Sequence, residues 1–222
     1  EIIAHMFKDC NSLQTVDVSN FDTSNVTSFV SVFNGCNSLT SLDLSSFNAE
    51  NVTNMDAMFH GCKNLESLDI SSFDTSNVTD MNSMFGGMKS LTDLDLSSFD
   101  TSNVTSMYGM FSGMSSLTEL DLSNFNTSKV TNMSSMFGYC SNLSSIDAFN
   151  WDTSKVTNMY RMFYSCNNLT EVKMGGDVSK VTDVSGMFGG SIAATGTFYY
   201  NPKYDYSKII EVLPSTWTAV PM

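Results

Sequence analysis

Residues 33–58 read FNGCNSLTSLDLSSFNAENVTNMDAM, and this unit returns along most of the chain with few changes. The phenylalanine that opens the unit recurs at a spacing of 26 residues six times and then once at 25. These residues are Phe7, Phe33, Phe59, Phe85, Phe111, Phe137, Phe163 and Phe188. A fixed period of this length predicts a solenoid, in which one repeat forms one coil and stacking buries its apolar residues.

A second pattern inside the unit predicts a strand. Leu39, Leu42 and Leu44 follow the frame L-x-x-L-x-L, and its last two leucines alternate with polar residues. Alternation with a period of two is typical of a strand with one buried face. Stacked coils would place like residues about 4.8 Å apart, the spacing between strands of a sheet. We therefore expect columns of like side chains to form one continuous core.

The frame and the period resemble those of leucine-rich repeats. The fuller phrase, LTSLDLSSF followed by NVTNM, resembles the repeats of BspA-like bacterial surface proteins, a variety also found in mycoplasma lipoproteins. The resemblance implies an α/β fold class: a right-handed solenoid with one parallel sheet on its concave side and short helical or 3-10 turns on its convex side. It also implies a protein that is secreted or displayed at the cell surface and used for adhesion.

The two ends of the chain differ from its middle. Residues 1–190 are predicted to form a solenoid of about seven coils that starts within a repeat, since Ile3 stands where Met55 stands in its own coil. We therefore expect further repeats, an export signal or an anchor before this start. Residues 191–222 are predicted to form a separate C-terminal cap. In it, Asp205 would begin a helix over 207–213 that ends before Pro214, with a strand near 216–220.

Charge and composition exclude several classes of function. The 222 residues contain 23 acidic and 10 basic side chains, a net charge of −13. Nucleic acid is therefore not expected as a partner, because phosphate binding needs clustered lysine and arginine. No apolar run reaches the roughly 18 residues of a membrane span. His5 and His60 occupy different repeat positions and lack a recurring nucleophile partner, so we expect neither an enzyme nor a cofactor or metal site.

All five cysteines occupy one repeat position, three residues after the recurring phenylalanine. They are Cys10, Cys36, Cys62, Cys140 and Cys166. Met88 and Met114 take this position in the two intervening coils, and a position that accepts either residue is a buried apolar slot. The odd number also leaves one cysteine unpaired in any disulfide scheme.

An aspartate row is predicted on the outward face of the strands, between the second and third leucines of the frame. The row consists of Asp17, Asp43, Asp69, Asp95, Asp121 and Asp147, with Lys173 in the next coil. Like charges on adjacent strands are destabilising. Two interpretations follow: the carboxylates accept hydrogen bonds from nearby hydroxyl and amide groups, or they form a surface for a basic partner or divalent cations. We favour the first.

The leading functional hypothesis is a non-enzymatic interaction module, extracellular or at the cell surface. Its expected partner is a protein or glycan of a host or neighbouring cell, and we expect a monomer. Outward residues depart from the repeat in the sixth and seventh coils, so the candidate ligand face consists of Asp95, Asp121, Asp147, Phe149, Glu171 and Lys173. Two alternatives stay open: a phage tail or virion-surface attachment protein, and a spacer or stalk without a ligand of its own.

Overall fold

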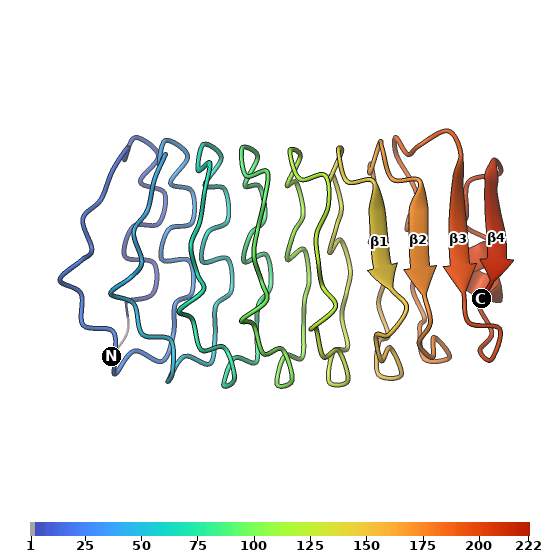
Figure 1. The fold of residues 1–222 in the computed structure, drawn as a ribbon, viewed down its shortest axis with the longest axis horizontal. Coiled ribbons are helices and arrows are strands. Elements are labelled where there is room, and N and C mark those ends of the chain that lie inside the picture. The colour runs from blue at the N-terminus through green and yellow to red at the C-terminus, as the bar shows by residue number, and fades with distance from the viewer. Residues whose placement is uncertain (1–2) are drawn as a thin grey trace.

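The protein is a rod of stacked coils in a computed structural model that describes residues 3–222. The chain winds from one end of the rod to the other, so that the two termini lie at opposite ends (Figure 1). Glu1 and Ile2, on which the predicted start within a repeat partly depends, lie outside the described residues. None of the helices formed by residues 3–222 has the length and apolar character that crossing a membrane requires.

The predicted columns of like side chains are confirmed. Phe59, Phe85 and Phe111 are fully buried and stack ring on ring, with centroids 6.1 and 5.9 Å apart. The stack continues on both sides, from Phe7 to Phe188, with neighbouring centroids 5.4–6.1 Å apart. Valine, methionine and leucine columns complete a core that runs along the whole rod. A coil on its own has no such neighbour, so the solenoid is stable only as a stack.

The predicted parallel sheet is present but short. It comprises β1 (Ser145–Ala148), β2 (Glu171–Met174), β3 (Gly196–Tyr200) and β4 (Trp217–Pro221), paired in that order. Figure 1 shows these strands side by side at the C-terminal end. In the earlier coils of the described chain, the leucine frame follows the same path without forming paired strands. We call the side of the rod that carries the leucine frames and the four strands the strand side.

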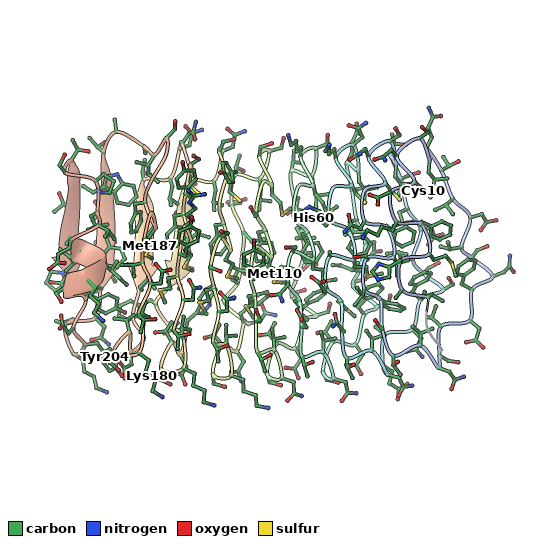
Figure 2. All side chains as sticks on the ribbon, turned by 180° about the vertical axis from the view of Figure 1, so that it is seen from behind. Cys10, His60, Met110, Lys180, Met187 and Tyr204 are labelled. Carbon is green, nitrogen blue, oxygen red and sulfur yellow. The ribbon has the colours of Figure 1, made fainter. Side chains whose placement is uncertain are left out.

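The opposite side of each coil, half a repeat from the strands, is held by a regular backbone pattern that we call the turn ladder. It consists of eight five-residue segments: 5–9, 31–35, 57–61, 83–87, 109–113, 135–139, 161–165 and 186–190. The first, third and fifth N–H groups of a segment donate to carbonyls of the following coil, at N···O distances of 2.6–3.1 Å. All three bonds run in this one direction at each of the seven joins between the segments. Figure 2 shows this side, with Met110 and Met187 labelled.

The turn ladder differs from the helical or 3-10 turns that were expected on this side. The first and fifth residue of every segment has a positive φ, between 51° and 78°, and all positive-φ residues among residues 3–222 stand at these two positions. Two left-handed residues that stand four positions apart interrupt a helix. The alternate N–H groups close single turns within the coil, as in the bond from Gly86 N to Ser83 O.

Residues 191–222 extend the sheet with β3 and β4 and contain α1 (Ser207–Ile210), the one helix in the described part of the chain. The helix begins where the sequence predicts, and the amide of Ser207 donates to the Asp205 carboxylate (2.9 Å). It is shorter than expected, because residues 211–213 form turns. The ring of Trp217 packs against Phe188, the last ring of the phenylalanine stack, at a centroid distance of 5.4 Å.

Candidate functional site

The aspartate row lies on the exposed strand side, and each carboxylate is held by its own coil. Oδ1 of Asp95 accepts a hydrogen bond from the backbone amide of Ser97 (2.9 Å), and Asp121 does the same with Ser123 (2.9 Å). These bonds lower the pKa of both carboxyl groups below the ordinary 3.8, because they favour the charged form. Asp95 and Asp121 are therefore fully ionised at neutral pH, and the hydrogen bonds fix the positions of their charges.

Three of the predicted residues meet in one groove of about 550 Å³ between the middle coils. Asp95, Asp121 and Asp147 line it together with Asp93 and Glu119, so that five carboxylates surround the same space. Leu94, Leu96 and Leu120 form the apolar part of the lining. A smaller groove of about 360 Å³ repeats the arrangement between Asp43 and Asp69. Such a site attracts a positively charged group with an apolar stem.

Asp93 and Glu119 were not among the predicted site residues. They stand two positions before Asp95 and Asp121, which in an extended segment places them on the same outward face. Most other coils carry serine or threonine there, as at Ser41. The signal that could have identified both residues was therefore a departure from the repeat at a position adjoining the aspartate row.

Lys173 occupies the place of the row's next aspartate and contacts the carboxylates beside it. Its Nζ lies 3.4 Å from Oδ2 of Asp147 and 3.3 Å from Oε1 of Glu171. Within residues 3–222 these are the ion pairs that the protein forms. The strands β1 and β2 pair regularly at this point, with Asp147 opposite Lys173. Lys173 thus places an ammonium group between two acidic side chains of the strand side, at a position where the earlier coils carry an aspartate.

Phe149, the remaining predicted residue, does not line the groove. Its amide donates to Oδ1 of Asp147 (3.0 Å), as the serine of other coils does. Its backbone lies so close to Gly175 of the next coil that a side chain at Gly175 would collide with the Phe149 carbonyl. The structure therefore brings together the carboxylates, Glu171 and Lys173, and leaves Phe149 at the end of β1.

The structure holds all five cysteines as free thiols; Cys36, Cys62, Cys140 and Cys166 are buried, whereas Cys10, in the first coil, is exposed. Sγ of Cys62 donates to the Phe33 carbonyl of the preceding coil (3.2 Å), and the three other buried cysteines make the equivalent bond. Burial raises the pKa of the Cys62 thiol to about 12. No group of three or more His, Cys, Asp or Glu side chains in the described chain is arranged to hold a metal ion.

Comparisons with known proteins identify the repeat. A family model described as Mycoplasma protein of unknown function, DUF285, matches residues 1–95 and 86–198. No curated protein matches the chain. A solved leucine-rich repeat protein from Bacteroides ovatus ATCC 8483 is 15% identical, with a TM-score of 0.23 over 88% of this chain and 78% of that one. That similarity is too low to carry an argument. The family match spans most of the sequence, and the chain, a BspA-like leucine-rich-repeat protein, belongs to this DUF285 family.

Proposed function

We propose that the protein is a non-enzymatic interaction module that binds a basic group of a protein partner in the acidic groove of the strand side. Stacked-coil proteins present long, rigid surfaces of the kind used for protein binding. The observation that carries the proposal is Lys173, an ammonium group already seated on Asp147 and Glu171 of the same surface. A lysine or arginine of a partner would find four further carboxylates in the groove beside Asp147: Asp93, Asp95, Glu119 and Asp121.

The biological setting that we propose is adhesion outside the cell. The partner is then a surface protein of a host or of a neighbouring cell, and the binding module acts as a monomer. The resemblance to BspA-like surface proteins and the match to a mycoplasma family support this setting. The net charge of −13 fits a partner of opposite charge, since electrostatic attraction speeds association with a basic surface.

We also propose that residues 191–222 cap a right-handed solenoid whose sheet lies on the concave side. Trp217 covers the end of the phenylalanine stack, and its Nε1 donates to the Ala193 carbonyl (3.0 Å). The Tyr206 hydroxyl donates to the carbonyl of Gly176, the residue that replaces the recurring aromatic of the earlier coils (2.7 Å). These contacts protect the apolar end of the last coil from water, which is the role of a capping segment.

The test is binding of a fluorescent pentalysine peptide, measured by anisotropy at low ionic strength. Asp95→Asn combined with Asp121→Asn should weaken binding by about tenfold or more, because two groove charges are lost. The control is Asp74→Asn combined with Asp100→Asn, which removes the same charge from a turn position where Asn48 and Asn126 already stand. The control should bind the peptide like the native protein.

The pH dependence follows from the lowered pKa of two groove aspartates, Asp95 and Asp121. Since their pKa lies below 3.8, binding should be unchanged between pH 7 and about pH 5 and be lost only as the pH falls below 3.8. Beads coated with the protein should adhere to cultured cells, and the groove variant should reduce their adhesion. Equal losses in the groove and control variants would show that only net charge matters. Absence of adhesion would favour the spacer, which the uniform middle coils also fit.

A further inference from the structure

Four side chains form an aromatic and cationic cluster on the turn ladder, on the side of the rod opposite the acidic groove. We call it the Tyr–Arg patch: Tyr139 from one coil, and Tyr160, Arg161 and Tyr164 from the next. The rings of Tyr139 and Tyr164 meet edge to face, with centroids 5.4 Å apart, and the side chain of Tyr139 is half exposed. The outward residues of this side vary from coil to coil.

Arg161 is the one arginine of the sequence, and its guanidinium group is placed by rings and not by carboxylates. Its Cζ lies 5.0 Å from the ring centroid of Tyr160 and 4.6 Å from that of Tyr164. Although the protein has a net charge of −13, the Arg161 side chain forms no ion pair or hydrogen bond with any of residues 3–222. The rings thus fix a cation whose N–H donors are free to bind an anion.

Two residues of the patch stand at positions where the backbone is left-handed, a conformation that large side chains rarely adopt. Tyr139 and Arg161 have φ values of 63° and 53°, which are unfavourable for a large side chain. At the ladder position of Tyr139, five of the eight segments carry glycine: Gly35, Gly61, Gly87, Gly113 and Gly190. In the last segment glycines make room for the patch, since a Cβ on Gly190 would lie 2.9 Å from the ring of Tyr164.

We propose that the Tyr–Arg patch binds a sugar residue that bears a carboxylate. Arg161 would hold the carboxylate through paired N–H···O bonds, and the exposed ring of Tyr139 would pack against the C–H face of the sugar. The tyrosine hydroxyl groups supply further polar contacts. The patch contains one cation on a strongly acidic protein, so it suits a single terminal acidic sugar. A long polyanion would be repelled by the remaining charge.

The experiment titrates the native protein with 3′-sialyllactose and follows binding by saturation-transfer NMR, with lactose as the uncharged comparison. Sialyllactose should bind, and lactose should bind about tenfold more weakly or not at all, because it lacks the carboxylate. Arg161→Gln should weaken sialyllactose binding by about tenfold, and Tyr139→Gly, which suits the left-handed backbone, by about threefold or more. The affinity of Arg161→Lys for sialyllactose should lie between those of the native protein and Arg161→Gln, because lysine keeps the positive charge but lacks the planar guanidinium group.

Tyr108→Ala is the matched control, because Tyr108 stands at the repeat position of Tyr160 two coils earlier and is 47% exposed. It should change binding by less than about twofold, and every variant is first checked for a native thermal unfolding transition. The proposal is overturned by the absence of sialyllactose binding up to about 10 mM, by equal binding of lactose, or by a native affinity in Arg161→Gln. Stronger binding of heparin than of sialyllactose would also overturn it. The strand-side variants should leave sialyllactose binding intact, so the proposal for the Tyr–Arg patch and the proposal for the acidic groove can be refuted independently.

Discussion

The strand side and the turn ladder differ in how regular their sequence is and in how regularly their backbones are hydrogen-bonded. On the strand side the sequence repeats closely, yet within residues 3–222 paired strands form only at β1–β4. On the turn ladder the outward residues vary, yet three backbone hydrogen bonds join every pair of successive segments. Backbone bonds do not depend on side-chain identity, so the ladder can hold the coils together while it carries His60, Tyr139 or Arg161. The sequence is therefore most regular on the strand side, whereas the backbone hydrogen bonds between coils are most regular on the turn ladder.

The largest expected effect comes from the phenylalanine stack behind the ladder. Phe111→Ala removes a buried ring that contacts Phe85 and Phe137, so it should lower the free energy of unfolding by about 3–5 kcal/mol. Leu120→Ala, a half-buried leucine of the strand side, should cost about half of that or less. Urea titration followed by circular dichroism measures both. Equal losses would contradict the view that the ladder side dominates the stacking.

Thiol reactivity separates the exposed end of the cysteine column from its interior. Cys10 is exposed, whereas burial raises the pKa of Cys36 to about 11 and that of Cys62 to about 12. Since the thiolate is the reactive form, Cys62 should react about a thousandfold more slowly than a free thiol at pH 8. A thiol-specific colour reagent should count one thiol in the native protein and five after denaturation. Rapid reaction of all five in the native protein would contradict the buried column.

The left-handed positions of the ladder predict two opposite changes in stability. Gly113→Ala meets no close neighbour but forces alanine to a φ of 76°, so it should lower the free energy of unfolding by about 1–2 kcal/mol. Ser135→Gly relieves the same strain at a φ of 56° and should raise stability by about 0.5–1 kcal/mol, the gain being reduced by the flexibility of glycine in the unfolded chain. Thermal unfolding of both variants in one buffer checks the signs. A stabilising Gly113→Ala would rule out the left-handed ladder.

The smallest expected effect is on the strand side. Lys173→Ala breaks two exposed ion pairs, so stability should change by less than about 1 kcal/mol. The same change frees Asp147 and Glu171, so pentalysine should bind a few-fold more tightly. Lys180→Ala, an exposed lysine outside the strands, is the charge-matched control and should leave the peptide affinity nearly unchanged. Weaker peptide binding by Lys173→Ala would mean that the lysine itself contacts the partner.

The features that could be predicted from the sequence are those in which the same residue type recurs in successive coils; features without a recurring residue type were not predicted. The phenylalanine columns and the cysteine slot followed from residue spacing, because buried positions in stacked coils accept few side chains. The left-handed ladder did not follow, since its first position holds Ser31, Ala57 and Arg161, which carry no common turn signal. The sequence signal of the left-handed ladder was the glycine that recurs at positions 35, 61, 87 and 113. The extent of the sheet was also not predictable, because the same leucine frame recurs in earlier coils that do not form paired strands.

The direction of the ladder bonds gives the rod an electrical polarity. Because the amide hydrogens of every segment point toward the following coil, the peptide dipoles of the ladder add along the axis in place of cancelling. The sum leaves partial positive charge toward the C-terminal end and partial negative charge toward the N-terminal end, the reverse of an α-helix. Every further coil would lengthen this dipole without changing its sign, so the side-chain charges at the two ends act within an unequal field that the backbone itself creates.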